Sequence, residues 1–322
     1  MKKLVLPILL ISIIGIFILS GCSKEECPQN VQVKVGTWKT AQTIQPFFYQ
    51  KFINNSYNIE VLPFTNPGDQ KTALLAGSLD MCGTTVVTAI AAASNGEPVV
   101  IVSGLCNKCS ALVVRNDSNI KRETDLKGKK IAYVPGSMHH ALLLEVLKRN
   151  GLDPQKDVEL KRIDFFDMGQ ALSQGTVDAF CSGEPYPSIA IAEGYGRILT
   201  YPYYDDNIGT INGAMITSRD KIKNNPKLIQ DLVIAHAKAT EYLKMNQNDW
   251  ISKAAEFGTD KKVLDVSAKN IDLSWDINEN YINNTKNLAD RMKALGIISQ
   301  IPDIDALFDC TFVKHAQEEL MK

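Results

Sequence analysis

The octapeptide Ala73-Leu74-Leu75-Ala76-Gly77-Ser78-Leu79-Asp80 returns 98 residues later as Ala171-Leu172-Ser173-Gln174-Gly175-Thr176-Val177-Asp178. In each copy a helical pattern ends at a glycine suited to a left-handed C-cap, a short polar residue turns the chain, and an apolar strand follows. A strand of this composition is expected to lie buried in a parallel sheet. The repeat therefore predicts two lobes of like construction.

Strand and helix patterns alternate around both copies of the repeat. The strands predicted around the first copy are 31–36, 59–62, 81–83 and 99–102, with helices at 44–52, 69–76 and 84–94. Around the second copy the strands are 130–133, 158–162 and 179–181, with helices at 137–150, 168–175 and 187–194. This alternation predicts the α/β class, with a mainly parallel, helix-covered sheet in each lobe.

Two short β-type segments bounded by turn residues, 111–115 and 212–217, are suited to connect the lobes. We therefore predict that residues 31–115 and 213–322 form the first lobe and residues 116–212 form the second, with a two-strand hinge. From Pro226 onward the pattern is mostly helical and is expected to pack behind the first lobe. The apolar face of its first long helix holds Leu228, Leu232, Ala235 and Ala239.

The N-terminus has the pattern of a secretory signal: Lys2 and Lys3 precede an apolar run over residues 4–19. A plain membrane anchor is the alternative, but the run is shorter than the ~20 residues that usually span a bilayer core. Leu19-Ser20-Gly21-Cys22 resembles the bacterial lipobox. We predict a signal peptide at 1–21, lipidation at Cys22 with palmitate among the acyl chains, and a tether at 22–30.

The charge of the chain alone names no partner. Its 322 residues carry a formal net charge of −1, which gives no electrostatic reason to expect nucleic acid or an anionic membrane surface. We expect a monomer without a cofactor, held by its lipid on the extracytoplasmic face of the cell membrane.

Four motifs of the chain are Leu126-Lys127-Gly128-Lys129-Lys130-Ile131-Ala132, Pro135-Gly136-Ser137-Met138-His139, Gly151-Leu152-Asp153-Pro154 and Gly183-Glu184-Pro185-Tyr186. With these motifs the chain resembles the periplasmic binding proteins of the nitrate, sulfonate, taurine and bicarbonate import systems and their thiamine-precursor-binding relatives. The resemblance implies a type II two-lobed fold, a ligand held in the cleft, and docking on an ABC permease with its ATPase. It implies no covalent chemistry.

The first-lobe candidates for ligand contact follow predicted strands, where ligands of open α/β sheets bind. Trp38 would offer a flat wall after Thr37, although it could equally close the core of its lobe. Gly83, Thr84 and Thr85 stand where a strand yields to a helix, whose free N–H groups suit an oxyanion. Capping of the helix would also explain the threonines.

The second lobe repeats this arrangement at Gly136, Ser137, Met138 and His139. Two helix N-termini that meet on one ligand favour a compact anion. The resemblance implies that His139 contacts this anion. His140 is assigned to the packed or solvated side. Glu184 is expected at the cleft floor, where its carboxylate would suit an amine or a metal, or would pair with a cation. The alternative for His139 and His140 is that they are two surface histidines on a helix. The alternative for Glu184 is a carboxylate that interacts with the dipole at a helix N-terminus.

The cysteines allow a third kind of site. Cys106 is expected near the cleft, and with Cys109 it forms a C-x-x-C for which a local disulfide is the first expectation outside the cell. Cys82 and Cys181 fit small buried hydrophobes. A soft pocket in which Cys106 and Cys109 meet a metal or a sulfur-containing ligand is the alternative. Cys27 and Cys310 could join the two ends of the chain.

The function that these patterns favour is extracytoplasmic capture of a small anion or small organic solute for an ABC importer. A thiamine precursor and a metal or sulfur-containing ligand remain alternatives for the solute. An enzyme related to the pyrimidine-synthesising members is a second class, and a surface sensory receptor is a third. Neighbouring permease and ATPase genes would favour transport, whereas an adjacent kinase gene would favour sensing.

Overall fold

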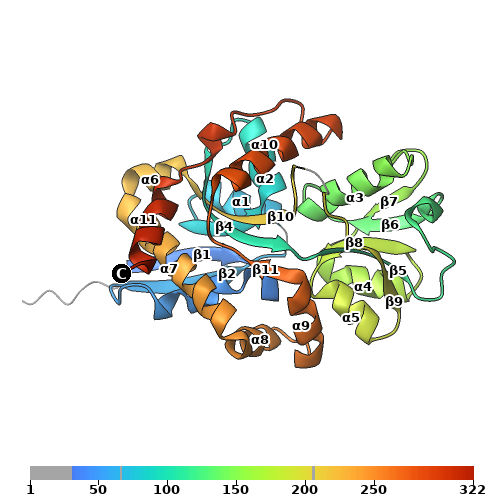
Figure 1. Ribbon diagram of the computed structural model, residues 1–322, viewed down its shortest axis with the longest axis horizontal. Helices are drawn as coiled ribbons and strands as arrows, with labels where there is room; N and C mark the ends of the chain where they lie inside the picture. Colours follow the sequence, from blue (N-terminus) through green and yellow to red (C-terminus); the bar gives the residue numbers. More distant parts are fainter. Residues whose placement is uncertain (1–30, 66, 205–206) are drawn as a thin grey trace, which may run out of the picture.

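The computed structural model describes residues 31–65, 67–204 and 207–322. The predicted signal peptide, Cys22, Cys27 and the tether lie outside these residues. Two β-sheets with flanking helices lie next to each other along the long axis of the molecule (Figure 1). The α/β class with one sheet in each lobe is therefore confirmed.

The larger sheet belongs to the first lobe. Its strands, in spatial order, are β11 (Ile271–Leu273), β4 (Val99–Lys108), β10 (Ile211–Ser218), β3 (Met81–Thr85), β1 (Val31–Thr37) and β2 (Tyr57–Pro63). β1 pairs in parallel with β2 and β3, as predicted for strands joined by helices. β10 is antiparallel to both β3 and β4, and β11 is antiparallel to β4.

The smaller sheet belongs to the second lobe. Its strands, in spatial order, are β7 (Glu159–Arg162), β6 (Lys130–Tyr133), β8 (Ala179–Gly183), β5 (Ser110–Arg115) and β9 (Gly196–Thr200). β6 is parallel to β7 and β8, whereas β5 is antiparallel to β8 and β9. Each sheet thus combines a parallel part with antiparallel strands at or near the connections between the lobes.

Helices cover the sheets in both lobes. Around the smaller sheet are α3 (Met138–Arg149), α4 (Phe165–Ser173), α5 (Tyr186–Ala192) and the 3-10 turn η3 (Glu123–Leu126). The first lobe holds α1 (Pro67–Leu75), α2 (Val86–Ser94), α6 (Arg219–Asn224), α7 (Pro226–Met245), α8 (Gln247–Ala255), α9 (Lys261–Ser267), α10 (Glu279–Ala294) and α11 (Thr311–Leu320), with 3-10 segments η1 (Ala41–Thr43), η2 (Gln45–Lys51), η4 (Ala268–Asn270) and η5 (Asp305–Leu307).

The two copies of the repeat hold their neighbouring strands in the same way. Asp80 Oδ2 accepts a hydrogen bond from Lys34 N, and Asp178 Oδ2 accepts one from Lys130 N, both at 2.9 Å. The amides of Asp80 and Asp178 donate back to the carbonyls of the same lysines at 2.8 Å. The glycine that ends each helix has φ of +80° in the first copy and +71° in the second, as a left-handed C-cap requires.

The first crossing between the lobes differs from its predicted place. The chain turns at Lys108 and Cys109, which have φ of +60° and +67°, and β5 then pairs between β8 and β9 in the smaller sheet. The boundary predicted at residue 115 therefore places this strand in the wrong lobe. Residues 111 to 114 are fully buried, and a strand that is apolar on both faces belongs inside a covered sheet. The remaining lobe limits stay predictions.

The helical tail packs on the first lobe. Leu228, Leu232, Ala235 and Ala239 of α7 are buried in the same cluster as β4 and β10, so the predicted apolar face of this helix is confirmed. α11 packs against α7 behind the larger sheet (Figure 1). α7 and α11 therefore brace the first lobe from behind, whereas other parts of the tail reach the second lobe.

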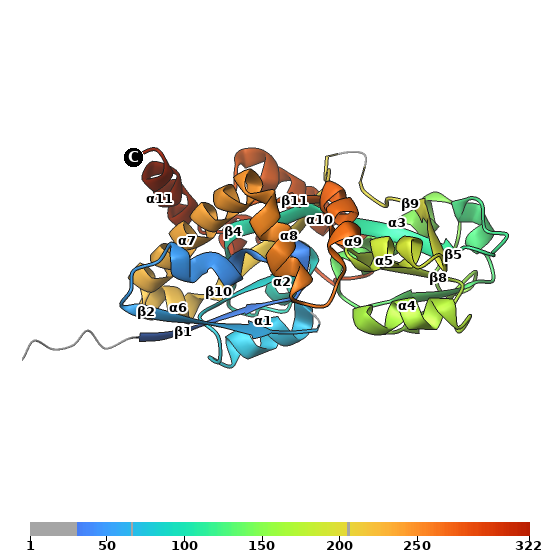
Figure 2. The ribbon, with the colours of Figure 1, turned by 90° about the horizontal axis from the view of Figure 1, so that it is seen from below.

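The lobes also meet through helices. Thr88 Oγ1 of α2 donates to Gly136 O, just before α3, at 3.1 Å. On another side of the junction, α9 lies beside α5 (Figure 2). These contacts fix the position of the space between the lobes.

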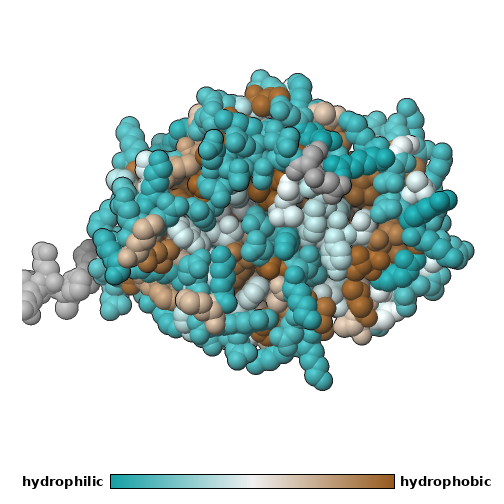
Figure 3. All heavy atoms as spheres, in the orientation of Figure 1, coloured by the Kyte–Doolittle hydropathy of each residue, from teal (hydrophilic) through white to brown (hydrophobic). Residues whose placement is uncertain are grey.

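The outer surface is mainly polar. Hydrophilic residues cover most of the face seen in Figure 3, and apolar residues appear there as separate patches. Among the residues that the structure describes, no helix is both long enough and apolar enough to cross a membrane.

Candidate ligand-binding site

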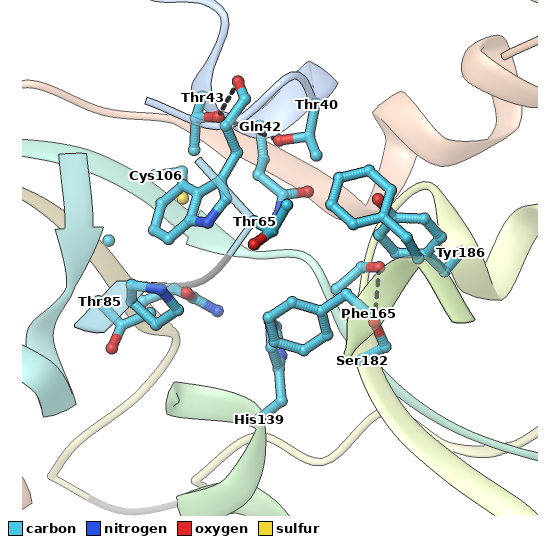
Figure 4. A pocket seen from close by; sticks show the side chains of 16 residues that line it. Thr40, Gln42, Thr43, Thr65, Thr85, Cys106, His139, Phe165, Ser182 and Tyr186 are labelled. Carbon is cyan, nitrogen blue, oxygen red and sulfur yellow. Dashed lines mark hydrogen bonds between the residues drawn. The ribbon is translucent and has the colours of Figure 1, made fainter. Parts of the chain in front are cut away.

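A cavity between the two lobes is lined by both of them (Figure 4). It contains about 510 Å³ of empty space, counting the part that opens to solvent. The first-lobe side consists of Trp38, Thr40, Gln42, Thr43, Thr65, Pro67, Thr85, Cys106, Asn212 and Gly213, and the second-lobe side of His139, Phe165, Phe166, Ser182, Gly183 and Tyr186. Of the predicted ligand-binding residues, it brings together Trp38, Thr85, Cys106 and His139.

Trp38 follows β1 and forms part of the first-lobe wall. The residue is 9% exposed, and its indole Nε1–H has no acceptor among the residues that the structure describes. Thr43 Oγ1 donates to Trp38 O at 3.1 Å, and Thr37 Oγ1 donates to Thr43 O at 2.8 Å. These bonds tie η1 to the strand end. Thr37 is therefore engaged inside the fold and lies outside the cavity lining.

Gln42 was missed in the sequence because it stands in a 3-10 turn that no periodicity marks. Its side chain points from η1 toward the centre of the cavity (Figure 4). Its Oε1 is buried and has no hydrogen-bond partner within the described part of the chain. The first-lobe wall thus presents one indole donor and one amide acceptor.

Thr85 is both the N-cap of α2 and a lining residue. Its Oγ1 accepts a hydrogen bond from Thr88 N at 3.1 Å, so the capping that we weighed as the alternative is present. Gly83 and Thr84 lie inside β3 and outside the lining, because Thr84 Oγ1 points to Pro67 O at 3.4 Å and Gly83 packs under Leu105.

His139 is the main polar group on the second-lobe side. Ser110 Oγ lies 2.9 Å from His139 Nδ1 and accepts from Asn212 Nδ2 at 3.2 Å. A serine hydroxyl can donate one hydrogen bond and accept two, so this contact holds the imidazole in either neutral tautomer. Burial lowers the pKa of His139 to about 3. His139 is therefore a neutral side chain whose Nε2 lies next to Gly183.

This serine and histidine do not form a nucleophile and base of the usual kind. Ser110 is fully buried and is outside the cavity lining. Its hydroxyl orients the imidazole from behind. The neighbouring His140 packs on the other side, with its ring centroid 4.6 Å from that of Tyr133.

The residues before His139 support α3 and lie outside the lining. Ser137 is the N-cap: its Oγ accepts from His140 N at 3.2 Å and donates to Val134 O at 2.8 Å. Met138 is fully buried in the core. Gly136 contributes its carbonyl to Thr88 across the lobes. The N-termini of both predicted anion-binding helices thus have their own side-chain caps.

Glu184 lies at the junction of the lobes and outside the cavity lining. It precedes Pro185 through a cis peptide bond and is 2% exposed. Its carboxylate accepts from Ser188 N and from Asn270 Nδ2, both at 3.3 Å. Burial raises the pKa of Glu184. Because Asn270 belongs to the first lobe, this carboxylate joins the lobes.

The aromatic side of the cavity was also missed. Phe166 and Tyr186 make an edge contact with ring centroids 5.5 Å apart, and Phe165 meets His139 edge-on at 5.3 Å. We predicted that this helix begins at Met168, but α4 begins at Phe165. The pair of phenylalanines directly after a strand was the signal that could have indicated the site.

The cysteines that the structure describes, Cys82, Cys106, Cys109, Cys181 and Cys310, are all free. The expected Cys106–Cys109 disulfide is therefore absent, although the two thiols are close enough to interact. Burial raises the pKa of Cys82, Cys109 and Cys181, so these groups stay thiols. Within the described ranges, no cluster of His, Cys, Asp or Glu is arranged to hold a metal ion.

Comparison with known proteins connects this architecture to solute-binding proteins. The family model described as NMT1/THI5 like matches residues 52–249. A protein of Escherichia coli (strain K12) that is named for binding aliphatic sulfonates is 33% identical over 162 residues, covering 45% of this chain and 50% of that protein. The nitrate/nitrite binding protein NrtA of Nostoc sp. strain PCC 7120 is 28% identical over 182 residues, covering 55% of this chain and 40% of that protein.

The matched region therefore spans half or less of the length of these relatives. A solved structure covers more: the alkanesulfonate-binding protein SsuA from Xanthomonas axonopodis pv. citri, bound to MOPS, superposes with a TM-score of 0.77. It is 22% identical, and the match covers 88% of this chain and 99% of that one. This likeness confirms the two-lobed periplasmic-binding-protein fold.

Proposed function

The chain belongs to the NMT1/THI5 like family, and we propose that it is the extracytoplasmic solute-binding protein of an ABC importer. In this role it captures a small anion or small organic solute between its lobes and delivers it to a permease with its ATPase. Relatives named for sulfonate and nitrate binding support the role. The observation that carries it is the cavity, to which both lobes contribute side chains.

The mechanism is a shift between open and closed arrangements of the lobes. A ligand that touches Trp38 on one lobe and His139 on the other stabilises only the arrangement in which both are near it. We expect the movement at the connections between the lobes, because hinge closure leaves the strand pairing within each sheet unchanged. The hydrogen bond from Thr88 to Gly136 then belongs to the closed arrangement.

The anchor and the partners complete the proposal. Lipidation at Cys22 would hold the protein at the extracytoplasmic face of the membrane, next to its permease, with two or more acyl chains needed for stable attachment. Mass spectrometry of the mature protein tests this, because a lipid-modified cysteine at its N-terminus is expected. An unmodified N-terminus would remove the anchor and leave solute binding in place.

Hydrogen exchange with a bound solute tests the binding role. A ligand found by thermal shift should slow amide exchange in residues 136–141 and 165–169 and in α2 together, because these segments meet on closure. The ligand should be recovered chemically unchanged. Protection of one lobe alone, or conversion of the ligand, would contradict a solute-binding protein that works by closure.

A further inference from the structure

A chain of buried hydrogen bonds connects the first lobe to His139 on the second-lobe side of the cavity. Asn212 of β10 donates from Nδ2 to Lys108 O at 2.7 Å and to Ser110 Oγ at 3.2 Å. Ser110 Oγ lies 2.9 Å from His139 Nδ1. Asn212, Ser110 and His139 are each at most 4% exposed. The chain therefore runs from β10, across the first connection between the lobes, to α3.

The direction of the bond between Asn212 and Ser110 follows from the chemistry of the amide. An amide nitrogen offers no acceptor, so Asn212 Nδ2 must be the donor toward Ser110 Oγ. Its two N–H groups are matched by two acceptors, Lys108 O and Ser110 Oγ. Ser110 Oγ therefore accepts from the first lobe, and its own proton has to find a different acceptor.

The proton of the Ser110 hydroxyl distinguishes the two neutral forms of His139. Within the described part of the chain, the acceptor that Ser110 Oγ can reach is His139 Nδ1. With the imidazole proton on Nε2, Nδ1 accepts the hydroxyl proton and all of these groups are paired. With the imidazole proton on Nδ1, the hydroxyl of a fully buried serine keeps a proton without an acceptor, which is costly. The contact alone allows both forms, but this accounting favours Nε2–H.

The strands of the second lobe place the other end of the imidazole at the cavity. Ser110 of β5 and Gly183 of β8 lie opposite each other in an antiparallel pair. A Cβ at Gly183 would lie 2.9 Å from His139 Nε2, and both residues line or border the cavity (Figure 4). Phe165 meets the imidazole edge-on, with ring centroids 5.3 Å apart. His139 Nε2 makes no hydrogen bond to the residues that the structure describes, so a proton there is available to a bound molecule.

Resting on the solute-binding role proposed above, we propose that Asn212 is a positioning residue for His139. From the first lobe, and through Ser110, it holds the imidazole proton on Nε2, so that the second-lobe wall offers the solute an N–H donor. Both N–H groups of Asn212 are used in the chain, so this effect on the solute is indirect. The donor of one lobe is thus set by a residue of the other.

Nuclear magnetic resonance of the histidine rings tests this proposal on the mature protein without added solute. Long-range proton–nitrogen spectra of protein labelled at its histidine nitrogens show which ring nitrogen carries the proton, and His139→Gln assigns the signals among the four histidines. At neutral pH, His139 of the unmodified protein should be protonated at Nε2. Asn212→Asp places a carboxyl oxygen that accepts from Ser110 Oγ, so the hydroxyl must accept from His139 and the proton should move to Nδ1.

Three further variants make the test specific. Asn116→Asp is the matched control, because Asn116 Nδ2 donates to Gly194 O inside the second lobe, and it should leave the His139 signals unchanged. Ser110→Ala removes the hydroxyl and should give a ring in which both neutral tautomers exchange. Ser110→Thr keeps a hydroxyl and should retain the Nε2–H form. A purely structural role of Asn212 and Ser110 would change the Tm of these variants and leave the position of the proton unaltered.

The outcomes separate this inference from the function on which it rests. A proton on Nδ1 in the unmodified protein would overturn the proposal, even if a variant fails to fold. Retention of Nε2–H in Asn212→Asp would refute the role of Asn212, and unchanged ring signals in Ser110→Ala would refute that of Ser110. Because no solute is added, each of these results leaves the solute-binding role intact. That role fails separately, if hydrogen exchange with a bound solute shows protection of one lobe alone.

Discussion

Glu145 of α3 and Arg291 of α10 form an ion pair between the lobes, with Arg291 Nη1 2.7 Å from Glu145 Oε1. The Glu145 side chain is 3% exposed and also pairs with Arg149 Nε on its own helix at 2.7 Å. A carboxylate buried to this degree is costly unless it is paired. The bond to Arg291 therefore favours the arrangement in which the lobes are together.

Arg291→Gln should weaken ligand binding without disturbing either lobe, because Arg149 continues to pair with Glu145. Arg291 is partly exposed, so we expect a loss of roughly 1 kcal/mol, or about fivefold in Kd. Calorimetry with a solute identified by thermal shift measures it. Lys227→Gln is the control, because Lys227 pairs with Asp231 inside one helix. Equal effects of the two changes would contradict a role of the interlobe pair in closure.

The buried histidines should make the protein sensitive to acid. His236 Nδ1 lies 2.8 Å from Tyr49 Oη, its Nε2 lies 2.9 Å from Gly104 O, and burial lowers its pKa to about 4. Its unfolded pKa is about 6.5. Between these values the unfolded chain binds the extra proton, so the free energy of unfolding falls as pH falls, by up to ~1.4 kcal/mol per pH unit for one histidine.

Urea unfolding at several pH values between 7.5 and 4.5 checks this dependence. His236→Gln should lower stability at neutral pH and reduce the slope of stability against pH by about one proton. The exposed His315 provides the control, and His315→Gln should leave the slope unchanged. A slope that His236→Gln does not alter would show that this histidine is not held neutral.

The repeat predicts a difference between its two aspartates. Asp178→Ala removes the hydrogen bond to Lys130 N, which we expect to cost about 1 kcal/mol. Asp80→Ala removes the equivalent bond to Lys34 N and also an ion pair with Lys221 Nζ at 2.6 Å, so its cost should be larger, about 2 kcal/mol. Denaturant unfolding measures both. A greater loss at Asp178 would contradict the assigned contacts.

The repeat shows why much of the fold could be predicted. Helix cap, turn and strand of each copy depend on neighbouring residues, so the pattern is visible in the chain itself. Glu184 shows the opposite case, because its partner Asn270 is 86 residues away. Gln42 and Phe165 reach the cavity through a 3-10 turn and an early helix start that local patterns do not indicate. Hence the sequence predicted the lobes and four lining residues, but not the aromatic side of the cavity.

The thiols offer a test of the cysteine assignment. The native protein with Cys27→Ser should react rapidly with a thiol reagent at Cys310. Among the cysteines that the structure describes, Cys310 is partly exposed and the other four are buried. After unfolding in the absence of oxidant, all five described cysteines should react. Absorbance of the released thiolate counts them. A persistent deficit of two thiols would indicate a Cys106–Cys109 disulfide.

Gly183 is the position where a single methyl group should block the site. A Cβ at Gly183 would lie 2.9 Å from His139 Nε2 and 3.0 Å from Gln42 Nε2, so side chains from both lobes would have to move. Overpacking of this kind typically costs 1–3 kcal/mol, and Gly183→Ala should weaken binding of a solute identified by thermal shift by about tenfold or more. Gly169→Ala in α4 is the control, because its Cβ would meet only the hydroxyl end of Tyr195, which can turn away. If calorimetry gave both variants the affinity of the unmodified protein, the ligand could not lie between His139 and Gln42, and the site would have to be placed elsewhere between the lobes.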